Sequence, residues 1–344
     1  MPDQDGTGAG QRGGQPGPAS ARLSPVRLHQ AVLAVALLVP AAVFAAAAWW
    51  NRGEVLADGA DAVERTVAVM QEHVGKVLDT TDLILDRLED HLRGRDQAAV
   101  AAAETSAFLV RLKAPFDQIV SIWVSGPDGH VLAGTQDWDR SVTITDREFF
   151  RVHLDRERSD GVNQTGGVNQ DGARGASHVS APFNGRATTA PSFAISRRRS
   201  GPDGRFEGVI HVAFSPAYFT RFFAGIAPPF AHAAGLVRAD GEILAQDPPI
   251  GRPTRLGPAS LLRGMPRDDT PAVALMGMAP DHIGPERIMV HRQVGRWPVR
   301  VYFAAQPEAM LGRWRQNLRA YGLVAGAAAV TLLAVAWLAL RQAR

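Results

Sequence analysis

The stretch SFAISRRRSGPDGRFEGVIHVAF, residues 192–214, decides the fold that this sequence predicts. Two runs that contain aromatic and branched apolar residues flank the turn sequence Ser-Gly-Pro-Asp-Gly at 200–204. Such runs, joined by a short turn with Pro and Gly, are typical of an antiparallel β-hairpin. We therefore predict a strand at 192–199, a turn, and a second strand at 205–214.

Hairpins of the same kind recur on both sides of this stretch. A second Ser-Gly-Pro-Asp-Gly lies at 125–129. The other predicted strand pairs are 119–124 with 130–133, 236–238 with 242–245, and 287–293 with 298–304. Single strands are expected at 177–182 and near 272–277, a helix at 146–156, and a bridging segment at 216–223. Four hairpins predict two antiparallel sheets.

Before the first hairpin, apolar residues recur every 3.5 residues. The stripe consists of Val63, Val67, Met70, Val74, Val77, Thr81, Ile84 and Leu88. A period of 3.5 held over nearly four heptads predicts a long helix with one apolar seam. The seam either packs on the domain that follows or forms a parallel dimer, and both alternatives remain open. Gly94 is expected to end this helix, and a second, Ala-rich helix follows at 97–112.

Two long uncharged runs lie near the ends of the chain. The first, 31–50, has twenty residues and ends in Trp49 and Trp50, and the second, 320–340, has twenty-one. Twenty helical residues rise about 30 Å, the thickness of the hydrocarbon core of a bilayer. The runs therefore predict two transmembrane helices. For the first, a signal peptide cleaved after the small residues Ala46–Ala48 is the alternative.

Arginines flank both runs and predict the topology. Arg22 and Arg27 precede the first run, and Arg341 and Arg344 follow the second. By the positive-inside rule, both termini are then cytoplasmic and residues 51–319 are extracytoplasmic.

The composition excludes several classes of function. The chain has no cysteine, so disulfide scaffolds and thiolate metal sites are ruled out. A net charge of +3, without a basic cluster, argues against nucleic acid as a partner. Neither His-Glu-x-x-His nor Gly-x-Ser-x-Gly occurs, and no nucleophile has an evident base. We therefore expect no enzyme activity, no metal and no cofactor.

Five motifs between the two apolar runs carry a family resemblance. They are Asp-Arg-Glu-Phe-Phe at 146–150, Ile-Ser-Arg-Arg at 195–198, Gly-Val-Ile at 208–210, Pro-Ala-Tyr-Phe at 216–219 and Trp-Pro-Val-Arg-Val at 297–301. In this order the chain resembles the double Cache family, the PAS-like extracytoplasmic sensor domains of bacterial sensor histidine kinases and diguanylate cyclases. The resemblance covers about residues 51–315.

The resemblance implies an α+β fold, in which two tandem PAS-like antiparallel-sheet modules lie on a long N-terminal helix between two transmembrane helices. The expected parts are a disordered cytoplasmic tail rich in Gly, Pro, Gln and Ser (1–27), a transmembrane helix (28–50), a long signalling and dimerisation helix with a second helix (51–113), a membrane-distal module (114–228), a membrane-proximal module (229–313) and a second transmembrane helix (320–340).

The implied function is that of an input module of bacterial signal transduction. A pocket in the distal module would bind a small molecule, and the long helix would carry the signal to the bacterial inner membrane, with the chain acting as a homodimer. Because only a few residues follow the second apolar run, we expect no output domain in this chain; it is then either an input module with a separate output partner or a truncated gene product, and both alternatives stay open. The alternative is a ligand-free scaffold of the cell envelope with the same fold.

The resemblance also implies which residues bind the ligand. Members that bind amino acids carry an Arg followed, one residue later, by Trp-Tyr. Here Arg147 is retained, but Phe149 and Phe150 replace the aromatic pair. A carboxylate ligand remains compatible with the guanidinium fork, whereas the lost indole N–H and phenol O–H argue against amino-acid specificity.

Six residues are the candidate ligand contacts: Arg147, Phe150, His153, Ser180, Arg186 and Ser196. Arg147 would follow a helix N-cap at Asp146, where the exposed amides also favour an anion. For each candidate the plain structural role of its residue type is the alternative. Arg174 is a further candidate that could close over an anion, with a solvated arginine as the alternative. The Asn- and Gln-rich segment 163–171 has too few carboxylates to bind calcium and is interpreted as a lid or a plain loop.

Overall fold

The structure is a computed structural model that describes residues 25–160, 177–187, 189–249, 255, 272–276 and 287–342. The chain divides into two compact units. One contains the chain up to Arg52 and from Trp314 onward, and the other contains Gly53–Arg313.

The first unit consists of two apolar helical segments. They are the first part of α1 (Pro25–Leu92) and most of α7 (Gly312–Gln342). Both helices are long and apolar enough to cross a membrane, judged by length and composition. Most large apolar side chains of the two segments in this unit are exposed, as a lipid-facing surface requires. Within this unit the Asn317 amide bonds the Asn51 side chain at 3.0 Å, and Pro40 does not interrupt α1.

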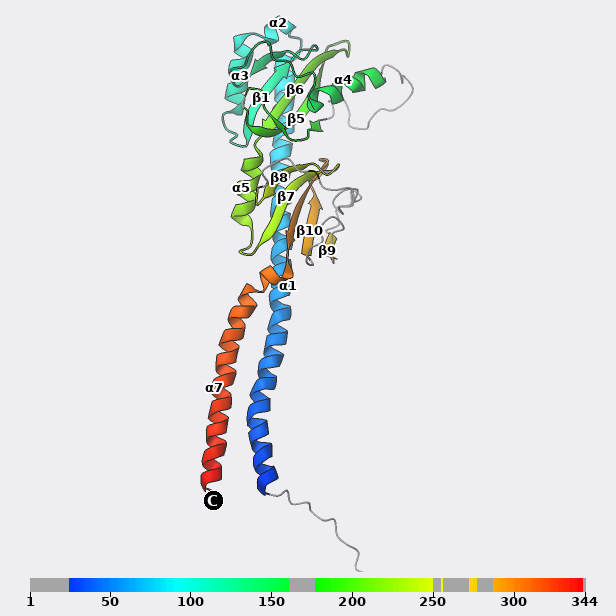
Figure 1. Cartoon of the computed structure of the whole chain (residues 1–344). Helices are drawn as coiled ribbons and strands as arrows, with labels where there is room; N and C mark the ends of the chain where they lie inside the picture. Colours follow the sequence, from blue (N-terminus) through cyan, green and yellow to red (C-terminus); the bar gives the residue numbers. More distant parts are fainter. Residues whose placement is uncertain are drawn as a thin grey trace, which may run out of the picture. The chain divides into compact units, whose positions relative to one another are not determined.

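The second unit contains two antiparallel sheets beside the remainder of α1 (Figure 1). The first sheet has the order β2-β1-β6-β5-β3, and β4 pairs with β5. Its strands are β1 (Ile119–Ser125), β2 (Val131–Gly134), β3 (His178–Val179), β4 (Phe183–Asn184), β5 (Pro191–Ser200) and β6 (Phe206–Phe214). α2 (Gln97–Val100), α3 (Ala103–Lys113) and α4 (Glu148–Asp160) accompany it.

The second sheet has the order β8-β7-β11-β10-β9. Its strands are β7 (His232–Arg238), β8 (Ile243–Asp247), β9 (Ala272–Met276), β10 (Arg287–Gln293) and β11 (Val299–Ala305). The helix α5 (Pro216–Ile226) connects the two sheets, and α6 (Pro307–Met310) leads into α7. The α+β class, the two antiparallel sheets and the four predicted hairpins are thus confirmed.

Several boundaries differ from those that the sequence predicts. The Asp96 carboxylate caps α2 by accepting the Ala99 N–H at 2.7 Å, but the helix predicted at 97–112 is broken into α2 and α3, because the backbone of Ala102 is extended between them. The strand predicted at 177–182 is reduced to His178–Val179. The helix predicted at 146–156 begins later, at Glu148, and ends at Asp160.

The apolar stripe of α1 packs inside its own chain. All eight of its residues are buried, and seven of them join the core that also contains Phe193, Phe214 and Phe303 of the sheets. This decides between the two alternatives for the seam. Within one chain these side chains are already covered, so this stripe is not available as a dimer seam.

Alternation along each strand of the first sheet sorts its side chains onto two faces. On β6, Ile210, Val212 and Phe214 lie in the core beside α1, whereas Val209 and His211 belong to the opposite face. That opposite face carries the candidate site.

A buried arginine ties β5 to α1. The Arg197 side chain is only 4% exposed and lies on the face toward α1. Its guanidinium contacts Asp82 at 2.8 Å, Asp86 at 2.6 Å and Glu89 at 3.5 Å. Three carboxylates of one helix therefore hold the strand that also borders the candidate site.

Candidate functional site

The candidate site is a pocket on the face of the first sheet that points away from α1. The sheet contributes Ser121 and Trp123 from β1, Ser192 from β5 and His211 from β6. The segments around Trp138–Phe149 and Phe183–Ala187 complete the lining. The empty space between these residues is about 520 Å³, including the part that opens to solvent.

Aromatic rings form most of the walls. Trp123 and Trp138 meet edge to face with centroids 5.5 Å apart, and Phe149 lies 5.1 Å from Phe183. The Trp123 indole N–H donates to Ser121 at 2.7 Å, whereas Trp138 Nε1 is buried without a hydrogen-bond partner among the described residues. The walls can therefore hold a flat or apolar body, with one indole donor left over.

Arg147 borders the pocket at the start of α4. Its carbonyl accepts the Arg151 N–H at 3.0 Å, so Arg147 itself takes the N-cap position that the sequence assigns to Asp146. Its guanidinium donates to the Asn184 carbonyl at 3.0 Å and lies 5.4 Å above the Phe183 ring. Among the described residues no carboxylate pairs with it. It is a half-buried cation that forms no ion pair in the described part of the chain, although the charge of the neighbouring Asp146 acts against the lowering of the Arg147 pKa by burial.

Arg186 also lines the pocket, and it is already paired. It donates to Asp146 at 2.8 Å and to the Thr143 carbonyl. Asp146 thus serves as the partner of Arg186 and not as a helix cap. Burial and the nearby Arg186 charge lower the pKa of Arg147. The two guanidinium groups are close enough to repel each other, which favours an anion near both.

His211 is a lining residue that sequence reasoning missed. It is 5% exposed, its ring lies 4.4 Å from the Phe149 ring, and its Nδ1 has no partner among the described residues. Burial and the Arg147 charge lower the pKa of His211 to about 3, so the ring is neutral at pH 7. The alternation of side chains along β6 could have predicted this, because it places His211 on the other face of the sheet from Ile210 and Val212.

Four of the six candidate residues do not line this pocket. Phe150 is fully buried in the core under α4, with its ring 5.5 Å from Phe206, and its neighbour Phe149 faces the pocket instead. His153 and Ser196 are both buried and bond each other at 2.9 Å. Ser180 donates to the Ala181 carbonyl at 2.8 Å and accepts the Ala194 N–H at 2.9 Å. Their polar atoms serve the fold at these positions.

Arg174 and the segment 163–171 lie outside the described residues. In the described part of the chain, no group of three or more His, Asp or Glu side chains is placed to hold a metal ion.

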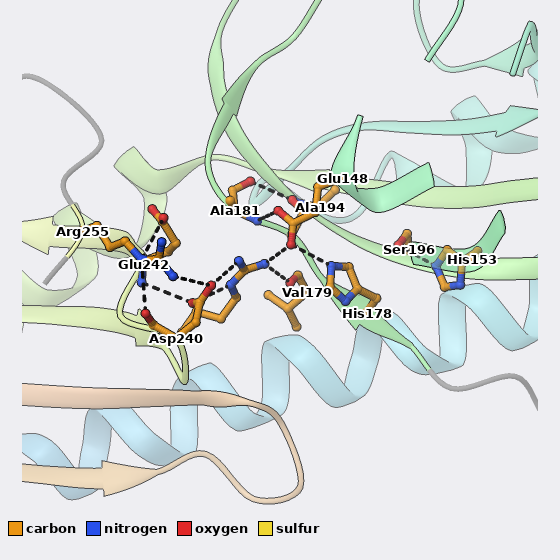
Figure 2. A network of polar contacts seen from close by, with 12 residues as sticks. Glu148, His153, His178, Val179, Ala181, Ala194, Ser196, Asp240, Glu242 and Arg255 are labelled. Atoms are coloured by element: carbon orange, nitrogen blue, oxygen red, sulfur yellow. Dashed lines mark hydrogen bonds and ion pairs between the residues drawn. The ribbon is translucent and has the colours of Figure 1, made fainter. Parts of the chain in front are cut away.

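Next to Arg147, Glu148 belongs to a polar network that joins the two sheets (Figure 2). Its carboxylate accepts bonds from Arg238, from the Ala181 N–H at 2.8 Å and from His178 at 3.2 Å. Arg238, at the end of β7, also contacts Asp240 at 2.6 Å and the Val179 carbonyl at 2.9 Å. The first turn of α4 is therefore fastened to the second sheet.

Acid is expected to weaken this connection. Partial burial by itself would raise the pKa of Glu148. Hydrogen bonds from His178, Ala181 and Arg238, together with the Arg238 charge, outweigh this and hold the pKa at about 2, below its ordinary value of 4.5. A lowered folded-state pKa stabilises the fold above the unfolded-state pKa, and this contribution is lost as the pH falls toward 2. Because the side chain is 41% exposed, we expect only about 1 kcal/mol at pH 7.

Thermal unfolding of the full chain in detergent, compared with Glu148→Gln, measures this contribution. The wild type should melt at a higher temperature than the variant at pH 7, and the gap should shrink between pH 4.5 and pH 3. A gap that stays constant over this range would show that the Glu148 charge does not stabilise the fold.

Comparison with known proteins identifies the fold. No protein-family model matches the chain, and no curated protein matches its sequence. Among solved structures, the extracellular domain of rpHK1S-Z16, described as a candidate histidine kinase, has a TM-score of 0.60 at 20% identity, covering 75% of this chain and 99% of its own. The fold is that of a Cache-type sensor domain.

Two further similar structures are ligand-binding domains of chemoreceptors. That of Campylobacter jejuni Tlp3, in complex with L-valine, has a TM-score of 0.48 at 13% identity and covers 76% of this chain and 98% of its own. That of the Pseudomonas aeruginosa PAO1 amino acid chemoreceptor PctB, in complex with L-Gln, has a TM-score of 0.48 at 13% identity and covers 74% of this chain and 93% of its own. In the Cache-type fold of this chain, the pocket lies on the first of the two sheets.

Proposed function

We propose that this chain is a membrane-anchored extracytoplasmic sensor that binds a small anion, such as a carboxylate, in the pocket of the first sheet. The observation that carries the proposal is Arg147, a half-buried guanidinium among aromatic rings with no described carboxylate as its partner. A cation that is partly desolvated and unpaired gains strongly from an anion that reaches it. The sensor would act without catalysis, as an input module of a bacterial signalling system.

The pocket also bears on the alternative of a ligand-free scaffold. A scaffold with this fold would be expected to fill the volume beside the first sheet with apolar side chains. Instead, two arginines and a buried histidine border an open space. These polar groups favour a sensor.

We propose that signalling uses two connections from the pocket. Arg147 is followed directly by Glu148, which is bonded to the second sheet through Arg238. On β5, Ser192 lines the pocket and Arg197 holds α1. A ligand that prefers one arrangement of these connections shifts the population toward it.

The two sheets support the proposed double Cache architecture. Every strand of the first sheet lies within 114–228 and every strand of the second within 229–313. The two apolar helices would anchor the sensor in the bacterial inner membrane, with 51–319 extracytoplasmic and both termini cytoplasmic.

We further propose that the sensor is a homodimer through the outward face of α1, because the predicted seam is already buried. On this otherwise charged face, Val69 and Leu83 are 47% and 68% exposed. In this cysteine-free chain, Val69→Cys or Leu83→Cys should form a disulfide between two copies in membranes under oxidation. Val67→Cys and Val74→Cys, at fully buried positions, should not. If neither exposed position forms a crosslink, the outward face of α1 is not the dimer interface.

A thermal-shift screen of the purified full chain in detergent tests the sensor function. The panel should contain organic acids, amino acids, amines, purines and sugars. We expect saturable stabilisation by an anionic class, and a ligand present at 100 times its Kd adds about 2.7 kcal/mol to the stability. If no compound of any class stabilises the protein or gives heat in calorimetry, the sensor function is contradicted.

A further inference from the structure

The charges around the pocket restrict which anions fit. Its described lining includes Arg147 and Arg186 but no Asp or Glu. The nearby Asp146 is not part of the lining and is bonded to Arg186 at 2.8 Å. The described lining therefore offers positive charge and no carboxylate to receive a positive group.

We infer that the pocket selects an organic carboxylate that has an apolar body and no ammonium group. This inference rests on the proposed function and names the ligand class of the same site. The carboxylate would lie against Arg147, with Arg186 beside it, and the body would lie between Trp123, Trp138, Phe149 and Phe183.

An α-amino acid fits this lining poorly. Its ammonium lies within a few ångström of its carboxylate, so an ammonium would come close to Arg147 and Arg186 whenever the carboxylate was bound. Like charges repel each other at this range, and a desolvated ammonium without a carboxylate or several acceptors is costly. Because Asp146 already pairs with Arg186, the repulsion comes chiefly from Arg147, the same cation that would hold the acid.

The aromatic walls favour an apolar body. Trp123 and Trp138 stand edge to face, and Phe149 and Phe183 lie on the side of Arg147. Rings of this size bury large apolar areas and contact flat groups at low entropic cost. A small hydrophilic anion would leave these walls without apolar contact.

Matched compounds that differ in one charged group test the inference. Three sets serve as probes: 3-phenylpropanoate, L-phenylalanine and 2-phenylethylamine; 4-methylpentanoate, L-leucine and 3-methylbutylamine; and indole-3-propanoate, L-tryptophan and tryptamine. Binding is measured by calorimetry on the full chain in detergent. We expect at least one acid to bind at least tenfold more tightly than its amino acid, and its amine not to bind.

A pair of variants tests whether the acid binds in this pocket. Arg147→Gln should weaken binding of that acid at least tenfold, whereas Arg151→Gln, one turn along α4 and outside the lining, should leave the affinity unchanged. An unchanged affinity in Arg147→Gln would contradict the assigned position of the carboxylate.

The remaining outcomes separate this inference from the sensor function. An amino acid that binds as tightly as its acid, or an amine that binds, overturns the inference while the sensor function stands. The same holds if all nine probes fail but another class in the wider screen binds. If no compound of any class binds, the sensor function itself fails and the inference fails with it.

Discussion

Replacing Arg197 by alanine is expected to lower the free energy of unfolding by about 3 kcal/mol, because it removes a buried guanidinium that contacts three partly buried carboxylates at once, although Asp82 keeps its contact with Arg296. The Arg197 side chain is 4% exposed, and its guanidinium neutralises Asp82, Asp86 and Glu89, which are 13–23% exposed. Removal of the guanidinium leaves three carboxylates close together on one helix. They would be partly desolvated and would repel each other. Thermal or chemical unfolding of the full chain in detergent measures the loss.

The matched control is Arg205→Ala. Arg205 lies just after the turn at 200–204, which follows the strand of Arg197. The Arg205 side chain is 83% exposed, and its contact with the Asp203 carboxylate is 4.0 Å long. This change should alter the stability by less than about 0.5 kcal/mol. A double-mutant cycle of Arg197→Ala with Asp86→Ala should show a coupling energy above about 1 kcal/mol. If the Arg197 and Arg205 variants were equally stable, the contacts of Arg197 with α1 would not stabilise the fold.

Replacing Arg147 by alanine should reduce the affinity for the ligand about 10- to 100-fold while the apo protein stays folded. Hydrogen bonds to a charged group contribute about 1.5–3 kcal/mol, which corresponds to this range. The fold loses little, because the guanidinium bonds only the Asn184 carbonyl among the described residues and is half-buried. The affinity is read from calorimetry with the compound that the screen identifies, and the fold from the melting temperature without ligand.

Lysine at the same position separates charge from geometry. Arg147→Lys should restore part of the affinity, since an ammonium keeps the charge but loses the planar fork. Arg151→Ala is the control, because Arg151 lies on the same helix and is exposed. Unchanged ligand affinity in Arg147→Ala would exclude Arg147 from the site and with it the observation on which the proposed function rests.

Most of the secondary structure could be predicted from the sequence, because its signals are local. The two Ser-Gly-Pro-Asp-Gly turns define hairpins whose positions agree with β1–β2 and β5–β6 to within a few residues. Helix starts were harder to predict. Asp146 looks like an N-cap by residue type, but the competing partner Arg186 comes from a segment far along the chain. Local preference therefore lost to a tertiary ion pair.

The candidate site was predicted only in part. Of the candidate residues, Arg147 and Arg186 line the pocket and Phe150 does not. A shift of one residue along α4 turns a side chain by about 100°, so Phe149 faces the pocket while Phe150 enters the core. His211 was missed because its neighbours depend on strand register: it is the partner of Trp123 on β1 and of Ser196 on β5.

The sequence by itself determined the elements: a long helix with one apolar seam, two sets of hairpins and two apolar runs of membrane length. These follow from periods of 3.5 and 2, from turn residues and from uncharged length, which are properties of neighbouring residues. Only the tertiary structure decided that the seam closes on its own chain and which polar groups border the pocket. Such contacts join residues far apart in sequence, such as Trp123 with His211, and depend on strand pairing and side-chain packing that no local pattern specifies.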